Sequence, residues 1–299
     1  MDYETFKSSA VASMQKHFGN HAAISLHPII KNNDIQLDGL MIEDKSVNIS
    51  PTIYLNYYYE DYLAGKPLDL IFDDIIASYQ DNLPQSDLDL SFFTDFCQVK
   101  YQIIYKLIHY EQNQTLLKDV PYFRFLDLAV VFCCYLSDIS TGNATILIHN
   151  HHLDFWKITK DCLYELAVKN TPILLPYELK SMGDTLKTLC PDFSLFSDHT
   201  DAPSDFPEMY VLTNTEKFYG ASAILYLNVL SCLAASLNEN LYIIPSSVHE
   251  ALLLPQKHIS QKEDLNCIIQ DVNASHVLKE EILSDHAYCF QRNLGFITL

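Results

Sequence analysis

The irregular order of strand-like and helix-like segments is the feature that most constrains the fold of this chain. Apolar residues at three-to-four spacing predict helices over residues 2–18 and 68–79, whereas residues 22–31 and 35–43 are typical of two strands joined by the turn Asn32-Asn33-Asp34. Later segments mix in the same way, without the regular strand–helix–strand rhythm of a doubly wound sheet. The sequence therefore predicts an α+β fold with mixed, largely antiparallel sheets and packed helices.

Three apolar segments in the second half of the chain predict buried elements. Phe125–Leu136, rich in Val and Phe, is typical of a strand, and Thr159–Lys169 is typical of a helix that ends before Pro172. Ala221–Leu237 is apolar nearly all round and predicts a buried helix. Further strands are predicted at 144–149, 209–213, 241–244, 251–254, 288–291 and 296–299, with a helix after the capping box that begins at Ser260.

The chain length permits one large domain or two ordinary ones. The 299 residues are 48% apolar, which provides for a sizeable core. We expect an N-terminal α+β region over residues 1–95, which carries an acidic helix, and a C-terminal α+β domain over residues 96–299.

The charge of the chain argues against one large class of function. The formal net charge is −19, and only two of the 19 basic residues are arginines, Arg124 and Arg292. A nucleic-acid binder needs a basic patch that displaces counterions, and arginine is the usual residue for bidentate phosphate contacts. We therefore expect no direct binding of nucleic acid.

The acidic residues are unevenly distributed along the chain. Between Glu60 and Lys100 there are nine acids against two lysines, and a loop predicted over residues 191–208 holds five acids and no Lys or Arg. An acidic face near residues 60–95 is a candidate contact surface for a protein partner. The alternative is that the charge only keeps the protein soluble.

Composition also bears on cofactors and location. The chain has 7 glycines and neither of the common glycine-rich nucleotide loops, so no cofactor is predicted. Its eight cysteines form no CxxC pair and mostly lie in apolar runs, which is typical of free, buried thiols. The N-terminus does not resemble a secretory leader, and the apolar runs are too short to cross a membrane. We expect a cytoplasmic protein.

The most metal-like segment is His149-Asn150-His151-His152. On a strand, His149 and His151 point to the same face, a spacing that can chelate a divalent ion. A third ligand such as Asp154 would complete the site. The alternative is a pair of solvated histidines at the end of a strand.

Two other segments carry the residue types of a catalytic site. Ser247, His249 and Glu250 could supply a nucleophile, a base and an orienting carboxylate, although on an extended chain Glu250 would point away from the other two. Asp285 precedes His286 and could orient its imidazole, and His286 could approach His249 if their strands pair. The candidate catalytic residues are thus His249, His286, Asp285 and Ser247. The alternative is that the serines cap backbone groups at a turn.

Several motifs together resemble one uncharacterised family. They are DLAVVF and GNATILI within Pro121–Ile148, MYVLTNTEKFYGASAILY at Met209–Tyr226, YIIPSSVHE at Tyr242–Glu250 and LSDHAY at Leu283–Tyr288. The chain resembles a domain-of-unknown-function family of clostridial Firmicutes over most of its length. Its C-terminal half is more distantly similar to the YtpQ family, which is also uncharacterised. The resemblance implies a bacterial cytosolic protein and transfers no catalytic residue.

Two hypotheses of function follow from the sequence. The first is a non-enzymatic binding or regulatory protein that contacts its partner through an acidic surface. The second is a small metal-assisted hydrolase that uses a His/Asp/Glu site built from the histidines named above. The hydrolase hypothesis requires those histidines to lie close to one another and to a carboxylate, whereas the binding hypothesis does not.

Overall fold

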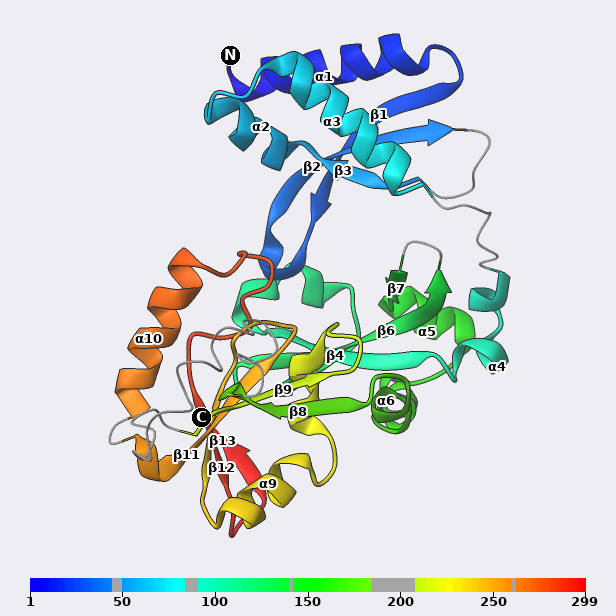
Figure 1. Cartoon of the computed structure of the whole chain (residues 1–299). Coiled ribbons are helices and arrows are strands. Elements are labelled where there is room, and N and C mark those ends of the chain that lie inside the picture. Colours follow the sequence, from blue (N-terminus) through cyan, green and yellow to red (C-terminus); the bar gives the residue numbers. More distant parts are fainter. Residues whose placement is uncertain (45–49, 84–90, 140–141, 184–207, 260–261) are drawn as a thin grey trace. The chain divides into compact units, whose positions relative to one another are not determined.

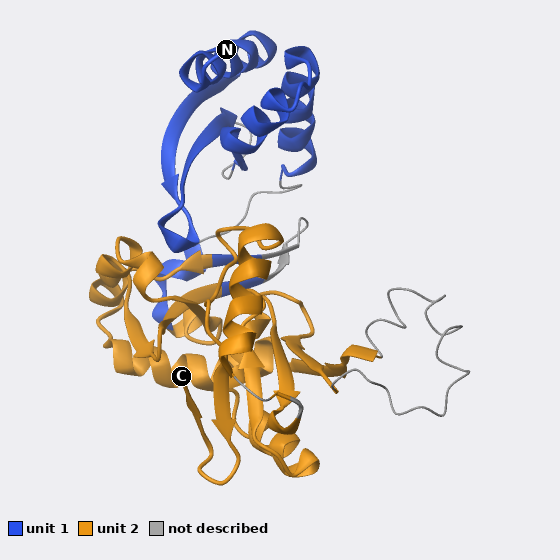
Figure 2. Cartoon of the chain, turned by 90° about the vertical axis from the view of Figure 1, so that its left-hand side faces the viewer, with its two compact units in different colours: residues 1–96, 135–145 blue, residues 97–134, 146–299 orange. Residues whose placement is uncertain are grey.

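The computed structural model describes residues 1–44, 50–83, 91–139, 142–183, 208–259 and 262–299 (Figure 1). These residues form helices and three sheets whose strands pair antiparallel, which confirms the predicted α+β class. The chain divides into two compact units (Figure 2). Unit 1 comprises residues 1–96 and 135–145, and unit 2 comprises residues 97–134 and 146–299.

Unit 1 packs three helices against a three-stranded sheet of order β1-β2-β3 (Figure 1). The turn between its first two strands contains Asn33 and Asp34, whose φ angles are 61° and 50°. Asn and Asp tolerate this left-handed region, as the sequence predicts. The elements are α1 (Tyr3–Phe18), β1 (Ala22–Ile30), β2 (Gln36–Asp44), β3 (Thr52–Tyr54), α2 (Leu55–Leu63) and α3 (Leu68–Asp81), with 3₁₀ turns at Asn32–Asp34 and Ser91–Thr94.

The core of unit 1 confirms that α1 and α3 are amphipathic. Side chains spaced three or four residues apart on each helix face the sheet, because that spacing places them on one side of a helix. Asp2 caps the start of α1 by accepting a hydrogen bond from the Thr5 N–H at 2.8 Å. The fully or almost fully buried members of this core are Phe6, Ala10, Met14, Leu40, Ile42, Leu55, Ile71, Ile75 and Tyr79.

Two further sheets lie mainly in unit 2, and two strands of the smaller one extend into residues 135–145, which belong to unit 1 (Figure 1). The larger one has the order β13-β12-β10-β11-β9-β8, and the smaller one has the order β4-β6-β5, with β7 also paired to β6. The strands are β4 (Ile103–His109), β5 (Tyr122–Phe125), β6 (Leu128–Ile139), β7 (Gly142–Leu147), β8 (Tyr177–Ser181), β9 (Tyr210–Asn214), β10 (Leu241–Ile244), β11 (Ala251–Pro255), β12 (Tyr288–Gln291) and β13 (Phe296–Thr298).

The helices of unit 2 cover these sheets. The hydroxyl of Thr171 in α6 accepts a hydrogen bond from the Tyr105 N–H of β4 at 3.0 Å, so α6 is tied to the smaller sheet. Leu265 and Ile269 of α10 pack on Tyr242 in the larger sheet. The helices are α4 (Phe96–Val99), α5 (Asn150–Trp156), α6 (Lys160–Leu174), α9 (Val229–Leu237) and α10 (Lys262–Ser275), with 3₁₀ turns at Glu111–Asn113, Leu116–Lys118, Gly220–Leu225 and Gln256–His258.

The predicted strand Phe125–Leu136 is wrong at its start. Phe125 pairs with Leu128, so the chain reverses through Leu126 and Asp127 and forms a hairpin of β5 and β6. Leu126 adopts a φ of 56°, which is uncommon for a residue with a branched side chain. The sequence carries no Gly, Asn or Pro there, and a single Asp at position 127 within an apolar run did not lead us to predict the hairpin.

Two predicted helices also differ from the structure. The segment Ala221–Leu237 is divided into a 3₁₀ turn and α9, because Tyr226 is extended and Asn228, the N-cap of α9, has a φ of 67°. By contrast, α6 continues through Pro172 instead of ending before it. Pro in a helix interior costs about 3 kcal/mol, and the burial of Leu163, Ala167 and Thr171 on α6 offsets this cost.

The cysteines at described positions are free, and three of them, Cys97, Cys232 and Cys267, are exposed, which corrects the expectation of mostly buried thiols. No helix in the described part of the chain is long and apolar enough to cross a membrane. Three predicted features lie partly outside the described residues. They are the acidic loop up to residue 207, the capping box at Ser260, and the acidic stretch at residues 84–90.

Candidate metal centre

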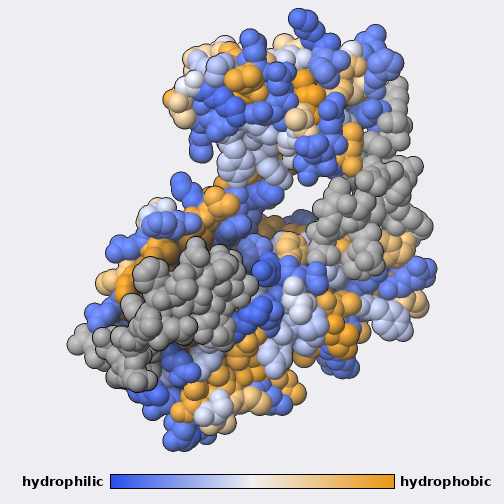
Figure 3. Space-filling view, in the orientation of Figure 1, coloured by the Kyte–Doolittle hydropathy of each residue, from blue (hydrophilic) through white to orange (hydrophobic). Residues whose placement is uncertain are grey.

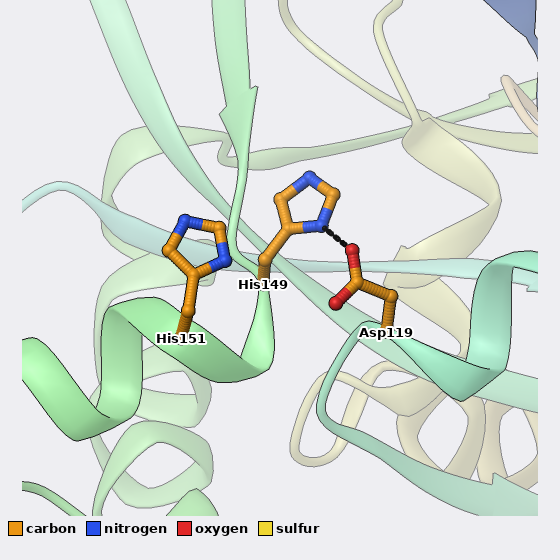
Figure 4. A group of neighbouring side chains, drawn as sticks. All are labelled: Asp119, His149 and His151. Carbon is orange, nitrogen blue, oxygen red and sulfur yellow. Dashed lines mark hydrogen bonds and ion pairs between the residues drawn. The ribbon is translucent and has the colours of Figure 1, made fainter.

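Three side chains in unit 2 form a group that can hold a metal ion: Asp119, His149 and His151. Each offers one ligand atom, and these atoms lie within 4.8 Å of one another. Figure 4 shows that Asp119 and His149 come from different segments and point toward each other, with His151 beside them. His149 and His151 are the two ligands that the sequence predicts, and Asp119 joins them from 30 residues earlier.

Backbone hydrogen bonds hold the two segments together. Asp119 follows the 3₁₀ turn Leu116–Lys118, and His149 is the N-cap residue of α5. The Asn150 N–H donates to the Asp119 carbonyl at 2.8 Å, and the Asn150 side-chain amide donates to the Lys118 carbonyl at 3.3 Å. These bonds fix the main chain beneath the candidate ligands, so the side chains are close before any ion binds.

The closest contact in the group joins His149 Nδ1 and Asp119 Oδ2, which are 2.7 Å apart. Two donor atoms at this separation can both reach an ion at the usual distance of about 2.0–2.2 Å. Without an ion, His149 Nδ1 can donate a hydrogen bond to the Asp119 carboxylate. Nε2 of His149 is then the atom left to bind a metal. Many metal sites contain a histidine that a carboxylate orients in this way. Asp119 can therefore serve as a ligand or as the group that orients one.

His152 contributes to the same segment in a different way. Its Nδ1 accepts a hydrogen bond from the His149 N–H at 3.0 Å, and its ring stacks on Trp156 with centroids 5.6 Å apart. Burial is the main cause that lowers the pKa of His152, and repulsion by the neighbouring imidazoles of His151 and His149 lowers it further. A neutral ring that accepts at Nδ1 fits both observations. His152 therefore stabilises the start of α5.

The sequence suggested that the histidines lie at the end of a strand. In the structure they lie at the start of a helix. β7 ends at Leu147, and His151 already belongs to the first turn of α5. Because His149 has extended backbone angles, its ring still lies 5.5 Å from that of His151, at an interplanar angle of 28°. The suggested third ligand, Asp154, is not in the group, whereas Asp119 is.

Two imidazole nitrogens and one carboxylate oxygen form a recognisable ligand set. Imidazole favours Zn²⁺, Fe²⁺ and other transition metals over Mg²⁺ or Ca²⁺. Three protein ligands leave coordination positions open for water or substrate, and this is the difference between catalytic zinc sites and closed structural ones. Asp119 and His151 are exposed and His149 is half-buried, so small solutes can reach the site.

His286, one of the predicted catalytic residues, lies in a second polar cluster of unit 2. Its Nδ1 is 3.7 Å from Oδ2 of Asp127, and the two oxygens of Asp127 accept hydrogen bonds from the hydroxyls of Ser284 and Tyr288. Asp285, the residue expected to orient His286, instead accepts from the Asn273 side-chain amide at 2.8 Å. The sequence analysis missed Asp127 as a member of this cluster. Its position as a charged residue within an apolar run could have indicated a buried polar contact.

His249 and Ser247, the other predicted catalytic residues, lie in the loop between β10 and β11. The Ser247 hydroxyl accepts a hydrogen bond from the His249 N–H at 3.0 Å, and the Tyr219 N–H donates to His249 Nδ1 at 3.3 Å. The His249 ring stacks on Tyr219, and its Nε2 lies 3.6 Å from Glu281. His249 therefore contacts Tyr219 and Glu281, whereas His286 is placed beside Asp127.

The fold and these clusters define an α+β protein with a candidate metal centre and a separate buried polar cluster in its larger unit. Residues 3–292 match a family of unknown function, DUF5688, and the chain belongs to this family. No curated protein matches the chain. No solved structure matches it either.

Proposed function

We propose that this protein binds a divalent transition-metal ion through Asp119, His149 and His151 and uses the ion for hydrolysis. The observation that carries the proposal is the convergence of two imidazoles and a carboxylate from separate segments within 4.8 Å. A bound Zn²⁺ lowers the pKa of its water to about 7, which supplies a hydroxide nucleophile at neutral pH. The open coordination positions allow that water to face a substrate.

Metal binding is tested with zinc and the full-length protein after treatment with a chelator. We expect isothermal titration calorimetry to show one zinc ion per chain, and Co²⁺ to give the visible absorption of a site with nitrogen ligands. Asp119→Asn and His151→Ala should each weaken zinc binding by at least about tenfold, which corresponds to about 1.4 kcal/mol. Both residues are exposed, so these substitutions should leave the fold intact.

His21→Ala is the matched control, because His21 is an exposed histidine of unit 1, outside the cluster. It should bind zinc as the unmodified protein does. An affinity for zinc that is the same in His151→Ala and His21→Ala would refute the metal centre.

A binding or regulatory role through an acidic surface is the second candidate. Asp69 and Asp73 are exposed on α3 and form no ion pair within the described residues, whereas Lys66 is paired with Asp61 and Asp74. Hydrophilic residues cover much of the helical layer of unit 1 (Figure 3). A cationic partner captured by the protein at low salt should be lost when Asp69 and Asp73 are both changed to Asn. Retention by this variant would contradict the role of α3.

The sequence-based expectations of a cytoplasmic location, a clostridial origin and a distant similarity to YtpQ stay predictions. Neither the match to a family of unknown function nor the finding on membrane-crossing helices, which concerns the described residues, decides them. The proposed hydrolytic role does not depend on them.

A further inference from the structure

A pocket of about 290 Å³ lies between α10 and the larger sheet of unit 2. Of the twelve residues that line it, ten are apolar, and the other two are Ser246 and Asn273. None of the twelve carries a charge, although the chain as a whole has a net charge of −19. None of the three candidate metal ligands lines the pocket, so it is a site distinct from the metal centre.

Two asparagines fix one side of α10. Oδ1 of Asn266 accepts a hydrogen bond from the Ala287 N–H at 2.8 Å, and the Asn273 side-chain amide donates to the Ser284 carbonyl at 3.1 Å. The two asparagines are seven residues apart, so they lie on the same side of the helix. They join α10 to the segment before β12. A movement of α10 toward β11 that closed the pocket would break these bonds.

The apolar stripe of α10 is only half covered by the sheet. Leu265 and Ile269 are buried, whereas Ile268 and Val272, at the edge of the stripe farther from the asparagines, are 56% and 42% exposed. All four side chains line the pocket, so the exposed pair forms its rim. Apolar walls that face water are unfavourable, because apolar surface gains free energy when it is removed from water. A ligand that covered these walls would gain that free energy.

The size of the pocket suits a small molecule and not a protein partner. An apolar cavity of about 150 Å³ in another protein binds benzene, so this pocket has room for two rings or for an aliphatic chain. A stable protein–protein interface engages about 20–30 residues on each side, whereas twelve residues line the pocket.

We infer that this pocket binds one small, uncharged molecule with a hydrocarbon body. A charged group would lose its hydration there without gaining an opposite charge, because no lining residue is ionised. The Ser246 hydroxyl, which lies 3.4 Å from Oε1 of Glu250, supplies a polar contact for one hydroxyl or N–H group of the ligand. The carboxylate of Glu250 near this serine disfavours a ligand with an anionic head group. This site goes beyond the proposed metal-dependent function.

The test uses the full-length protein and N-phenyl-1-naphthylamine, an uncharged two-ring probe whose fluorescence rises in apolar surroundings. We expect saturable binding of one probe molecule per chain. Uncharged 1-decanol should displace the probe. Decanoate has a chain of the same length but is ionised at neutral pH, so it should compete at least about tenfold more weakly.

Two rim substitutions locate the probe. Ile268→Glu places a carboxylate at the rim and Val272→Trp fills the opening, so each should weaken probe binding by at least about tenfold. Ile173→Glu and Val168→Trp are the matched controls. Ile173 and Val168 are 74% and 43% exposed on α6 and do not line the pocket, so both controls should bind the probe as the unmodified protein does.

Circular dichroism and urea denaturation verify that the four variants are folded. Equal probe affinity in Ile268→Glu and Ile173→Glu, or displacement by decanoate as effective as that by decanol, would overturn the assignment. A dimer of the unmodified protein that Ile268→Glu dissociates would assign the pocket to a second copy of the chain and would also overturn it. Zinc affinity should be the same in all four variants, so the outcome leaves the proposed metal centre untouched.

Discussion

The Ser284 hydroxyl donates a hydrogen bond to Oδ2 of Asp127 at 2.6 Å, although the two residues are 157 positions apart in the chain. Ser284 is fully buried, and the other oxygen of Asp127 accepts from Tyr288 at 2.7 Å. The turn between β5 and β6 is thereby joined to the segment that precedes β12. This contact connects the two sheets of unit 2 through a carboxylate.

Ser284→Ala should lower the free energy of unfolding by about 1.5–3 kcal/mol, the range for hydrogen bonds to charged groups. The reason is that the carboxylate of Asp127, which is only 16% exposed, loses a donor that water cannot easily replace. Urea denaturation measures the change. Ser275→Ala serves as the control, since the Ser275 hydroxyl bonds the Asp271 carbonyl in an exposed position. Equal losses in the two variants would contradict a special role for Ser284.

Gly220→Ala should destabilise unit 2 by about 1–3 kcal/mol, as expected of overpacking. A Cβ atom at this position would overlap Thr213 Oγ1 and the His249 carbonyl and would lie 2.8 Å from the Asn214 nitrogen. The substitution would also break the hydrogen bond from Thr213 to that carbonyl, which is 2.8 Å long. Thermal or urea denaturation provides the measurement.

Gly183→Ala is the comparison for Gly220, because among the described residues its Cβ would meet the Ser181 hydroxyl, at an ordinary 3.8 Å, and no other atom within 4 Å. It should change stability by less than about 0.5 kcal/mol. A Gly220→Ala protein as stable as Gly183→Ala would show that the loop holding His249 yields to the added methyl group.

The stability of the protein should fall as the pH drops below about 6.5, the unperturbed pKa of histidine. Burial lowers the pKa of His109, and nearby Asp127, Asp285 and Glu111 offset this only in part. The unfolded chain then binds a proton that the folded protein resists, so protonation favours unfolding. The stabilisation that neutral His109 provides is fully present above the pKa of this histidine in the unfolded chain. It is lost as the pH falls toward the pKa of His109 in the folded protein. One such group contributes at most about 1.4 kcal/mol per pH unit.

The contribution of His109 is measured by urea denaturation at about pH 7.5 and about pH 5.5 in the unmodified protein and in His109→Gln. Glutamine can still accept the hydrogen bond that the Gln112 N–H donates to His109 Nδ1 at 3.1 Å. The difference in unfolding free energy between the two pH values should be smaller in the variant, and part should remain because the pKa of His152 is also lowered. Identical differences in the two proteins would exclude His109 as the source.

The cysteines should divide into a fast and a slow group toward maleimide in the folded protein. Cys97, Cys232 and Cys267 are exposed, whereas Cys133 and Cys134 are fully buried on β6. Burial raises the pKa of Cys134 to about 12, so almost no reactive thiolate is present near neutral pH. Mass spectrometry of labelled peptides measures the rates. Labelling of Cys134 as fast as Cys267 would show that β6 is open to solvent, and denatured protein gives the reference rate.

Local sequence patterns predicted the fold class and most of its elements. The three-to-four spacing of apolar residues gave α1 and α3, and Asn33 and Asp34 gave the turn between β1 and β2, because these signals act within a few residues. The same reasoning failed at Leu126 and Asp127, where a turn interrupts an apolar run, and at Pro172, where packing of α6 outweighs the local preference.

The candidate sites depended on contacts that no local pattern contains. The pair His149 and His151 was visible from its spacing, but its carboxylate partner Asp119 is 30 residues away and is brought near by main-chain hydrogen bonds. Asp127 reaches Ser284 across 157 residues in the same way. The sequence by itself determined which side chains could do chemistry and how each short segment folds. Only the tertiary structure decided which of them meet, because residues far apart in the chain become neighbours through the packing of whole elements.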